Sequence, residues 1–220
     1  LKIKSMAGLA QAARRGRLHE LPGFGAKLEQ TILKATEAHV SGEQRVRLFA
    51  AEQVAIPLVK YLEALKGIEK VIVAGSYRRR KETVGDLDIL AIHPDGAKAI
   101  GHFVKYNEVA SVLAEGTTRA TVKLKSGLQV DLRVVPAKSY GAALLYFTGS
   151  KAHNIQLRQM GVKKGLKINE YGAFRKEKWL AGREEKEMYA QLGLPYIEPE
   201  LRENTGEIEA AIAGNLPHLL

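Results

Sequence analysis

The chain has 220 residues, 45% of them hydrophobic and 26% charged, a composition typical of a folded globular protein and not of a disordered one. Lys and Arg outnumber Asp and Glu by 34 to 24, and the net charge of +10 favours a polyanionic partner such as nucleic acid. The absence of cysteine excludes disulfides and thiolate metal sites, and the sequence contains no signal peptide or membrane-spanning run.

The basic residues are concentrated in two stretches of the chain. Residues 1–47 contain nine basic and four acidic side chains, and residues 151–178 contain eight basic and two acidic ones. The balance reverses in residues 184–209, with eight acidic and two basic side chains, so we expect this stretch to face away from the polyanion. Because the sequence begins at Leu1 and not at Met, we expect an excised or processed piece of a longer chain.

The first part of the chain, residues 1–66, is predicted to be helical because it lacks strand patterning. Between two helical patterns lies the sequence LPGFGAK, residues 21–27, which resembles a helix-hairpin-helix module. In such a module two glycines, here Gly23 and Gly25, let the backbone approach a DNA phosphate, and Lys27 adds positive potential. The alternative is a plain glycine-containing turn between two helices.

The middle of the chain changes to strand patterning, and a helical pattern returns after Pro136. We therefore predict an α+β fold in three parts: helical DNA-binding residues 1–66, a mixed sheet with covering helices in residues 67–136, and an α/β part in residues 137–220. Within the first part, Pro57 is expected to break or kink a helix. Strands are expected at residues 71–74, 86–92, 109–113, 120–124, 128–135 and 166–169, and helices near residues 76–80, 96–105, 140–147, 153–160 and 184–192.

Two carboxylates at i and i+2 follow a Gly-Ser turn and a basic run in the middle of the chain. Asp86 and Asp88 share one face of the expected strand, since alternate side chains of a strand point the same way. Paired oxygen ligands suit Mg²⁺ better than zinc. The turn at Gly75 and Ser76 would aim backbone N–H groups and the serine hydroxyl at phosphate oxygens, and residues 78–81 would supply countercharge.

These features together predict a site for a metal-bound nucleoside triphosphate. The sequence lacks the motif of a Walker-type phosphate loop, so the triphosphate must be held in another way. Taken singly, the acidic pair could be a solvated strand edge and the basic run an exposed basic face. A third carboxylate, Asp131, shares the polar side of its expected strand with Gln129 and Arg133. If this strand neighbours the acidic pair, the three carboxylates could hold two Mg²⁺ ions ~3.5–4 Å apart for in-line phosphoryl transfer.

Several motifs together resemble the family X DNA polymerases, the group that includes DNA polymerase beta and its bacterial relatives. The resemblance runs over nearly the whole chain: it is carried by LPGFGAK, by the motifs GSYRR and GDLD, by the VDLR strand with Asp131, and by the selective segments YFTGS at residues 146–150 and INEY at residues 168–171. It implies a polymerase core made of helical fingers, a nucleotidyltransferase palm and a thumb. We expect the family's lyase domain and carboxy-terminal phosphoesterase domain to lie outside this sequence.

The resemblance also implies a role for each matching residue. Asp86, Asp88 and Asp131 would be catalytic and bind the metal ions, with Asp131 also placed to accept the proton of the primer hydroxyl. Two positions depart from the vertebrate beta enzyme: Lys151 replaces an acidic residue in the nucleotide pocket, and Gln129 replaces an arginine beside the third carboxylate. The expected nucleotide-binding residues are Ser76, Arg79, Gly85, Tyr146, Phe147, Gly149 and Asn154, and the expected DNA-binding residues are Gly23, Gly25, Lys27, Arg158 and Tyr171.

We therefore expect a template-directed DNA polymerase that adds deoxynucleotides to a 3′ hydroxyl by two-metal phosphoryl transfer and fills short gaps in DNA repair. Its cofactors would be two Mg²⁺ ions, with Mn²⁺ as the substitute, and its partners deoxynucleotide triphosphates and gapped or primer-template DNA. The resemblance implies a monomer in the bacterial cytoplasm, associated with the nucleoid. Two alternatives stay open: a nucleotidyltransferase acting on RNA ends or small molecules, and a non-catalytic DNA-binding module.

Overall fold

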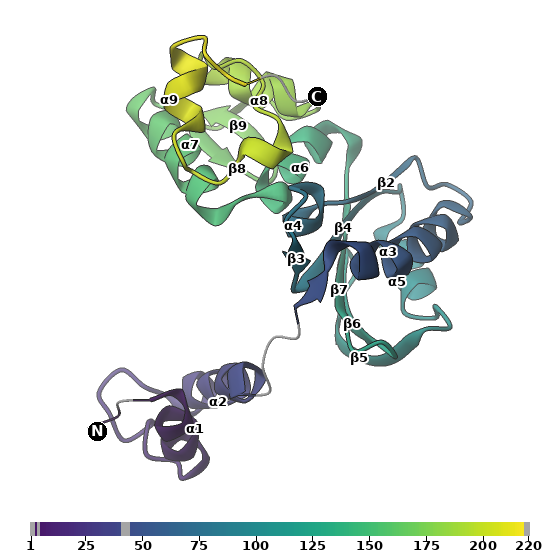
Figure 1. The fold of residues 1–220 in the computed structure, drawn as a ribbon, viewed down its shortest axis with the longest axis vertical. Coiled ribbons are helices and arrows are strands. Elements are labelled where there is room, and N and C mark those ends of the chain that lie inside the picture. The colour runs from purple at the N-terminus through teal and green to yellow at the C-terminus, as the bar shows by residue number, and fades with distance from the viewer. Residues whose placement is uncertain (1–2, 4, 41–44, 218–220) are drawn as a thin grey trace. The chain divides into compact units, whose positions relative to one another are not determined.

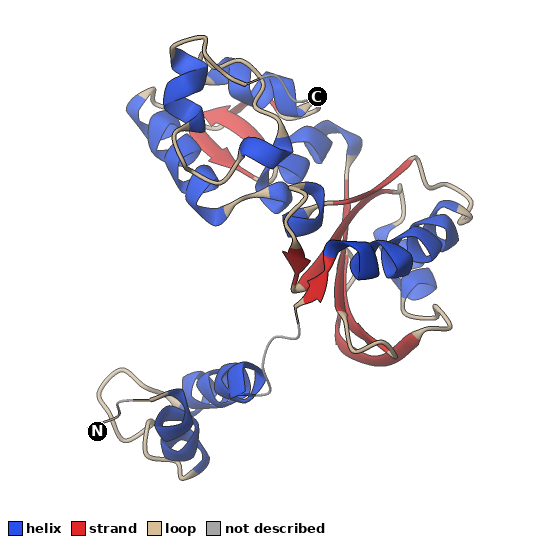
Figure 2. Ribbon diagram, viewed as in Figure 1, coloured by secondary structure: helices blue, strands red, loops and turns tan. Residues whose placement is uncertain are grey.

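The computed structural model describes residues 3, 5–40 and 45–217 of the chain. These residues belong to two compact units, residues 1–44 and residues 45–220, which are described separately (Figure 1). Figure 2 shows helices in the first unit and both helices and strands in the second. The α+β class predicted from the sequence is therefore confirmed. None of the helices in the described part of the chain is long and apolar enough to cross a lipid bilayer.

The first unit contains two helices, α1 (Met6–Arg14) and α2 (Ala26–Val40), joined by the hairpin segment. Leu18, in that segment, lies in the small apolar core of the unit. The buried carboxylate of Glu29 on α2 accepts hydrogen bonds from the N–H groups of Leu18 at 2.8 Å and His19 at 3.3 Å, and it pairs with the His19 ring at 2.5 Å. These polar contacts attach the connecting segment to α2 and supplement a core that is small.

The second unit is built around a five-stranded sheet with the strand order β2–β4–β7–β6–β5. β4 and β7 run parallel, and the other neighbouring pairs are antiparallel. This is the mixed sheet expected from the strand patterning. Its strands are β2 (Lys70–Val73), β4 (Asp86–Ile92), β5 (Val109–Glu115), β6 (Arg119–Leu124) and β7 (Gln129–Val135).

Helices α3 (Leu48–Glu63) and α5 (Gly96–Phe103) cover one face of this sheet, as Figure 1 shows. Leu58 of α3 and Phe103 of α5 are fully buried against alternate strand residues such as Leu87. α3 continues through Pro57, where we expected a break or a kink. On the opposite face, the first residues of β4 and β7 are polar, whereas Leu90 and Val135 farther along pack against a separate apolar cluster.

The packing of α3 places the end of the helical amino-terminal part earlier than the sequence suggested. α3 lies inside residues 1–66, yet its buried side chains belong to the core of the sheet, and the first unit ends at Gln44. A short strand before α3, β1 (Val46–Arg47), pairs with β3 (Thr83–Val84). Because an amphipathic helix has the same pattern whichever layer it covers, the sequence alone did not assign α3 to the sheet.

The carboxy-terminal part of the second unit has its own apolar core. A three-stranded antiparallel sheet and its surrounding helices enclose buried residues such as Leu157, Tyr189 and Ile197. The elements are α6 (Tyr140–Thr148), α7 (Lys151–Lys163), β8 (Lys167–Asn169), β9 (Gly172–Arg175), β10 (Lys178–Ala181), α8 (Glu185–Gln191) and α9 (Glu207–Ile212), with 3₁₀ turns at Ala137–Ser139 and Pro199–Leu201.

Helix α6 connects the two cores of the second unit. Leu144 packs against Leu90 of β4, whereas Leu145 faces the carboxy-terminal core. The short helix α4 (Gly75–Arg78), which follows β2, also contacts α6. The segments that carry the Gly-Ser turn and the YFTGS motif are therefore brought together.

Candidate active site

Three carboxylates meet on the face of the five-stranded sheet opposite to α3 and α5. Asp88 of β4 and Asp131 of β7 are direct partners in the parallel register, and Asp86 lies two residues before Asp88, on the same face. Ligand oxygens of all three lie within 4.8 Å of one another. The sequence predicted that the three carboxylates would meet if their strands were neighbours. The pairing of β4 with β7 satisfies that condition.

The carboxylate of Asp131 is held on both of its oxygens by uncharged donors. The hydroxyl of Thr121 on β6 donates a short hydrogen bond to Oδ1, and the side-chain amide of Gln129 donates to Oδ2 at 2.9 Å. Thr121 is the cross-strand partner of Asp131 in the antiparallel register of β6 and β7. Because both donors are neutral, they orient the carboxylate without cancelling the charge that a cation would use.

The chemistry of the cluster fits divalent metal ions. Burial, followed by the nearby carboxylates of Asp86 and Asp131, raises the pKa of Asp88 to about 7, although Arg133 and Arg79 oppose the shift. A cation stabilises like charges that are crowded in a partly buried place, and carboxylate oxygens are donors that Mg²⁺ and Mn²⁺ prefer. The residues present are therefore suited to hold a divalent cation.

A glycine brings the Gly-Ser turn against these carboxylates. Gly75 begins α4 with a φ of 59°, a left-handed conformation that favours glycine. A Cβ atom at this position would overlap the carboxylate of Asp88. The N–H of Ala74, one residue earlier, donates to the carbonyl oxygen of Asp88 at 2.6 Å. The backbone of the turn thus lies directly beside one of the three acidic residues.

An open cleft of about 490 Å³ lies between this turn and the end of α6. Its volume is within the range of sites that hold a ligand of nucleotide size. Nine of the residues that the sequence assigned to the catalytic, nucleotide or DNA sites line this cleft: Ser76, Arg79, Asp86, Asp88, Tyr146, Phe147, Gly149, Asn154 and Arg158. The structure therefore brings the GSYRR, GDLD and YFTGS motifs to a single cleft.

Two aromatic rings also line the cleft. Tyr146 and Phe147 lie edge to face, with ring centroids 5.0 Å apart. The side-chain amide of Asn154 donates to the carbonyl oxygen of Tyr146 at 2.7 Å, and the guanidinium of Arg158 lies 6.0 Å from the Tyr146 ring centroid. Arg133 of β7 lies 4.4 Å from the centroid of Phe147. Each ring therefore has a cation near it, which stabilises its orientation.

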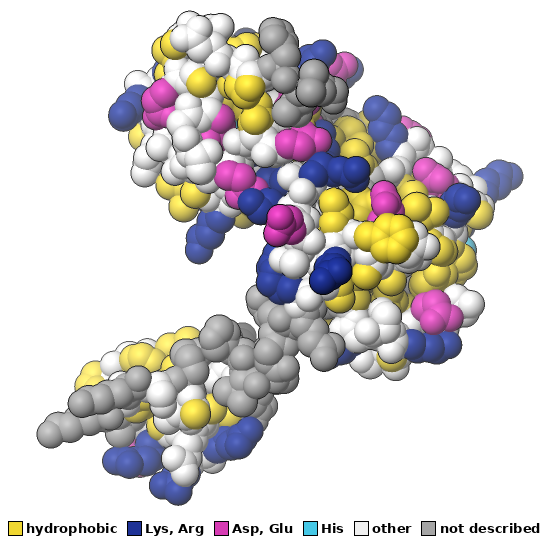
Figure 3. All heavy atoms as spheres, viewed as in Figure 1, with side chains coloured by type: hydrophobic (Ala, Val, Ile, Leu, Met, Phe, Trp, Pro, Cys, Tyr) yellow, Lys and Arg dark blue, Asp and Glu magenta, His cyan; other side chains and the backbone are white. Residues whose placement is uncertain are grey.

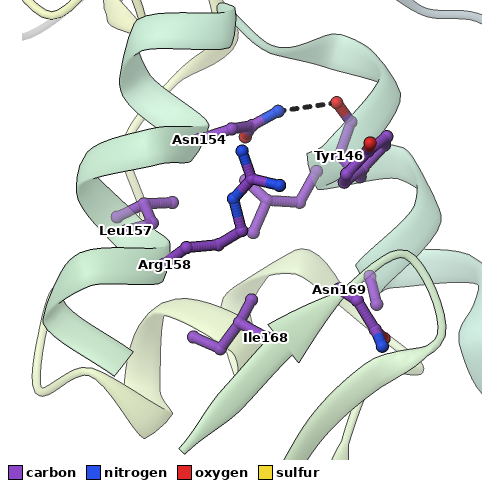
Figure 4. Close-up of a pocket in the computed structure, with 8 residues that line it drawn as sticks. Tyr146, Asn154, Leu157, Arg158, Ile168 and Asn169 are labelled. Carbon is purple, nitrogen blue, oxygen red and sulfur yellow. Dashed lines mark hydrogen bonds between the residues drawn. The ribbon is translucent and has the colours of Figure 1, made fainter. Parts of the chain in front are cut away.

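A smaller pocket adjoins the cleft between α6, α7 and β8. Figure 4 shows Arg158 extending from α7 toward Asn154 and Tyr146, with Ile168 and Asn169 on β8. Tyr146, Asn154 and Arg158 line both the pocket and the cleft. These three side chains therefore form the wall that separates the two spaces.

The basic run at residues 78–81 does not direct all of its charge to the cleft, contrary to our expectation. Of its four residues, all of which the structure describes, only Arg79 lines the cleft. Arg78 instead makes two hydrogen bonds with the carboxylate of Glu185, at 2.9 and 2.7 Å. Two longer ion pairs involve the rest of the run: Arg80 with Glu52 at 3.9 Å, and Lys81 with Glu203 at 3.6 Å. Most of the run therefore forms ion pairs within the protein.

The acidic stretch, residues 184–209, supplies several of these partners and does not simply face away from a polyanion, as we had expected. Glu185 is buried between Arg78 and Arg202, whose Nη1 donates to it at 2.6 Å. Burial alone would raise the pKa of Glu185, but the hydrogen bonds and charges of the two arginines lower it overall. Figure 3 shows acidic and basic side chains interspersed over α4 and the elements next to it. The stretch therefore connects the carboxy-terminal part to α4.

Two residues of the expected nucleotide and DNA sites, Gly85 and Tyr171, do not line the cleft. Gly85 is not among the described residues that line it, and a Cβ there would lie 3.2 Å from a guanidinium nitrogen of Arg45. Tyr171 is 57% exposed between β8 and β9 and does not line the cleft either. Gly85 therefore lies next to Asp86 in the chain without lining the cleft, and Tyr171 does not line it.

The expected hairpin residues lie in the first unit, whose position relative to the cleft is not described. A Cβ added to Gly23 or Gly25 would have no atom within 4 Å, so the backbone at both positions is open to a ligand. Gly23 has a φ of 85°, which favours glycine. The side chain of Lys27 lies outside the described residues.

The structure adds residues to the site that the sequence did not assign. Arg45 and Thr148 line the cleft together with Lys151, which the resemblance had noted only as a departure. Thr121 and Arg133 lie next to the carboxylates. The alternation of β7 could have identified Arg133, because it shares the polar side of that strand with Asp131. No local pattern distinguishes Arg45 or Thr121 from other surface residues.

Comparison with known families and proteins gives the same picture. Residues 50–160 match the DNA polymerase beta palm family, and residues 143–203 match the DNA polymerase beta thumb family. The chain is 34% identical over 213 residues to the DNA polymerase/3′-5′ exonuclease PolX of Bacillus subtilis (strain 168), a match that covers 95% of this chain and 37% of that protein. It is 29% identical over 174 residues to DNA polymerase lambda of Arabidopsis thaliana, covering 64% of this chain and 33% of that protein. The chain thus spans about a third of the length of these curated relatives.

Two crystal structures of Leishmania infantum polymerase beta share the fold. The ternary P/T complex is 24% identical with a TM-score of 0.67, and the match covers 91% of this chain and 89% of that one. The ternary gap complex is 23% identical with a TM-score of 0.68, and the match covers 91% of this chain and 81% of that one. At this level of identity the likeness is evidence for the fold alone.

The mixed sheet carries three clustered carboxylates, and two of them, Asp86 and Asp88, line the cleft together with the Gly-Ser turn. Joined to a smaller α/β part, this arrangement defines a nucleotidyltransferase of the palm-and-thumb class. Because the palm family matches just over half of the chain, the chain belongs to the family X DNA polymerases, with the palm and thumb of DNA polymerase beta. We refer to residues 45–136, which contain the five-stranded sheet, as the palm and to residues 137–217 as the thumb; the family matches themselves cover residues 50–160 and 143–203.

Proposed function

We propose that this protein is a template-directed DNA polymerase that adds deoxynucleotides to a 3′ hydroxyl and fills short gaps during DNA repair. The observation that carries the proposal is the cluster of Asp86, Asp88 and Asp131, whose oxygens lie within 4.8 Å of one another beside the cleft. Membership of the family X DNA polymerases supports it, and so does the net charge of +10, which favours a nucleic acid as substrate.

The proposed cofactors are Mg²⁺ ions held by Asp86, Asp88 and Asp131, and Mn²⁺ suits the same oxygen donors. When bound, such ions lower the pKa of an attacking hydroxyl and offset the charge on the leaving pyrophosphate. The chain itself keeps the carboxylates oriented, as Thr121 and Gln129 do for Asp131. We further propose that a carboxylate oxygen of Asp131 accepts the proton of the primer 3′ hydroxyl.

The deoxynucleotide triphosphate is proposed to bind in the cleft. Arg79 and the hydroxyl of Ser76 line the cleft and are donors of the kind that bind phosphate oxygens. Tyr146, Phe147 and Gly149, which also line the cleft, would crowd the position where a ribose carries its 2′ hydroxyl. Gly85 is kept as a candidate for close backbone approach only, because it does not line the cleft among the described residues.

Gapped or primer-template DNA is the proposed partner. The open backbone at Gly23 and Gly25 suits a sequence-independent contact with a DNA phosphate, which Lys27 would strengthen. Asn154 would contact the incoming base and Arg158 the template, since both residues line the cleft. The exposed ring of Tyr171 on the thumb is a further candidate for a DNA contact. We also propose a monomer that acts in the bacterial cytoplasm at the nucleoid, on the basis of the DNA substrate and the B. subtilis relative.

Primer extension on templated, gapped and blunt DNA, with deoxy- and ribonucleotides, tests the proposal. We expect addition that follows the template, requires a divalent cation and prefers deoxynucleotides. Asp131→Ala should abolish addition and leave DNA affinity nearly unchanged, because metal binding and phosphate-backbone contacts are separate contributions. Glu115→Ala, which changes an exposed acidic residue of β5, is the matched control.

Other outcomes would contradict the proposal in different ways. Addition without a template would indicate a terminal nucleotidyltransferase. Addition to an RNA primer, included as a further substrate, without addition to DNA would indicate a nucleotidyltransferase that acts on RNA ends. No addition on any substrate with either Mg²⁺ or Mn²⁺ would indicate a DNA-binding module. Full activity of Asp131→Ala would show that the carboxylate cluster is not the catalytic site.

A further inference from the structure

Arg79 of the palm is held at the edge of the cleft by two groups of the thumb. Its Nε donates to a carboxylate oxygen of Glu203 at 2.8 Å, and its Nη1 donates to the carbonyl oxygen of Thr148 at 2.6 Å. Gly149 permits this approach, because a Cβ at that position would lie 3.2 Å from the same Nη1. Only 14% of the Arg79 side chain is exposed, so the guanidinium has a defined position before any ligand binds.

These two hydrogen bonds determine which donors remain for a ligand. An arginine side chain carries five N–H donors, and the thumb occupies one on Nε and one on Nη1. One donor on Nη1 and two on Nη2 are left. The bond to Glu203 occupies Nε, so a bidentate phosphate contact would use Nη1 and Nη2. Since Arg79 lines the cleft, Glu203 and Thr148 leave these remaining donors for the triphosphate.

The negative charge of Glu203 would by itself repel a nearby phosphate. Lys81 offsets this charge, since its Nζ lies 3.6 Å from the same carboxylate oxygen that accepts the bond from Arg79. The group of Arg79, Lys81 and Glu203 therefore keeps a net positive charge. Glu203 can orient the arginine without making this side of the cleft negative.

Glu203 itself is held firmly by the structure around it. The preceding residue, Arg202, is fully buried, with Nε donating to the carbonyl oxygen of Ile197 at 2.9 Å and Nη1 donating to Glu185 at 2.6 Å. The carbonyl oxygen of Arg202 accepts the N–H of Ser150 at 2.9 Å. The backbone that carries Glu203 is thus bonded to the YFTGS segment that lines the cleft.

We propose that Glu203 is a positioning residue for nucleotide binding: through Arg79 it holds the donors that bind the triphosphate, without touching the nucleotide itself. The inference rests on the proposed function, because it takes the cleft as the nucleotide site. It also gives a role to the acidic stretch of the thumb, which the sequence alone led us to place away from any polyanion.

Single-turnover incorporation into gapped DNA, at varied nucleotide concentration, tests the inference. Glu203→Ala should raise the apparent nucleotide Kd by about five- to tenfold and change the maximal rate by less than about twofold, because an orienting charge-assisted bond is lost. Glu203→Gln keeps an oxygen acceptor for Nε, so its Kd should return to within about threefold of wild type. Glu200→Ala removes an exposed acidic side chain of the same stretch and controls for the change in net charge.

Binding without chemistry provides a second readout. Nucleotide affinity is measured on complexes whose primer lacks the 3′ hydroxyl, and the same order of affinities is expected. The loss in Arg79→Ala/Glu203→Ala should equal the loss in Arg79→Ala alone, since Glu203 acts through Arg79. Thermal unfolding of each variant verifies that it is folded.

Three results would overturn the inference. In the first, Glu203→Ala binds nucleotide as tightly as wild type, and in the second it binds nucleotide more tightly. In the third, the loss of nucleotide affinity in Arg79→Ala/Glu203→Ala equals the sum of the losses in the two single variants. Failure of the proposed function would instead appear as absent incorporation by the wild type. The binding comparison would still decide the role of Glu203 in that case.

Discussion

Thr121 of β6 donates a hydrogen bond to the carboxylate of Asp131, its cross-strand partner on β7. Gln129 donates to the other oxygen of the same carboxylate at 2.9 Å. Each oxygen of Asp131 therefore has one interaction supplied by the chain and keeps capacity for a ligand. The third carboxylate of the cluster depends on β6 for its orientation, in addition to the two strands that carry the acidic residues.

Thr121→Val keeps the shape of the side chain and removes the donor to Asp131. Loss of a donor behind a metal ligand weakens metal binding or activity by about 10–100-fold, so we expect the Mg²⁺ concentration for half-maximal addition to rise by about tenfold. Mn²⁺ binding followed by electron paramagnetic resonance should weaken in parallel. Thr121→Ser retains the hydroxyl and is the control. An unchanged metal dependence in Thr121→Val would show that the hydrogen bond does not support the site.

Gly75→Ala tests the close approach of the Gly-Ser turn to Asp88. The added Cβ would overlap the Asp88 carboxylate, and the φ of 59° is unfavourable for alanine. Strain of this kind costs about 1–3 kcal/mol of unfolding free energy, and displacement of Asp88 should also lower the rate of nucleotide addition. Urea unfolding and single-turnover rates measure the two effects.

Gly101→Ala provides the matched control for this substitution. Gly101 lies inside α5, and a Cβ there would meet no atom within 4 Å. Alanine is favoured over glycine in a helix interior, so this variant should be as stable as wild type or more stable by up to about 1 kcal/mol. Equal stability losses in both variants would mean that the overlap with Asp88 is relieved at little cost.

The acidic pair could be predicted from the sequence, whereas its surroundings could not. Asp86 and Asp88 share a face because alternation along a strand is a local property. The proximity of Asp131 depended on β4 and β7 being neighbours, which no pattern within either strand specifies. For the same reason the donor Thr121, which comes from a third strand, was missed.

The partners of the basic run illustrate a second limit of sequence reasoning. Arg78 and Glu185 are separated by 107 residues in the sequence and meet only because α4 and α8 both pack against α6. A charged stretch has the same composition whether it faces solvent or a buried arginine. The sequence therefore predicted a basic run that supplies countercharge to a triphosphate and an acidic stretch that faces away from the polyanion, where the structure has ion pairs between palm and thumb.

Stability is expected to depend on pH through His153 in the thumb. Its Nδ1 pairs with the Glu207 carboxylate at 2.6 Å and its Nε2 with the Tyr189 hydroxyl at 2.9 Å, a set of partners that suits a neutral ring. Burial lowers the pKa of His153 below its ordinary value of 6.5, although Glu207 opposes the shift. As the pH falls, His153 is therefore protonated in the unfolded chain at a higher pH than in the folded one. Its contribution to the free energy of unfolding is complete above a pH of about 6.5 and is lost as the pH falls below that value.

Urea unfolding between pH values of about 8 and 5 checks this prediction. The midpoint for wild type should fall as the pH drops below about 6.5, and His153→Gln should reduce the slope in that range. Glu185 and Glu207, whose pKa values are lowered, contribute a separate loss below about pH 4.5. A slope unaffected by His153→Gln would refute the assignment.

The boundary between the two units can be tested by truncation. Residues 45–220 contain α3, whose fully buried Leu58 and Leu62 belong to the core of the palm sheet. A chain that begins at residue 67, near the boundary expected from the sequence, lacks both. Burying the two leucines contributes about 3–6 kcal/mol. A typical domain is stabilised by about 5–15 kcal/mol, so their loss removes a large part of the stability.

We expect residues 45–220 to unfold cooperatively with a midpoint close to that of the full chain. Residues 67–220 should be unfolded or aggregated, as measured by circular dichroism and size-exclusion chromatography. A folded, cooperative 67–220 chain would show that α3 is not required for the sheet, and an unfolded 45–220 chain would show that the palm depends on the first unit.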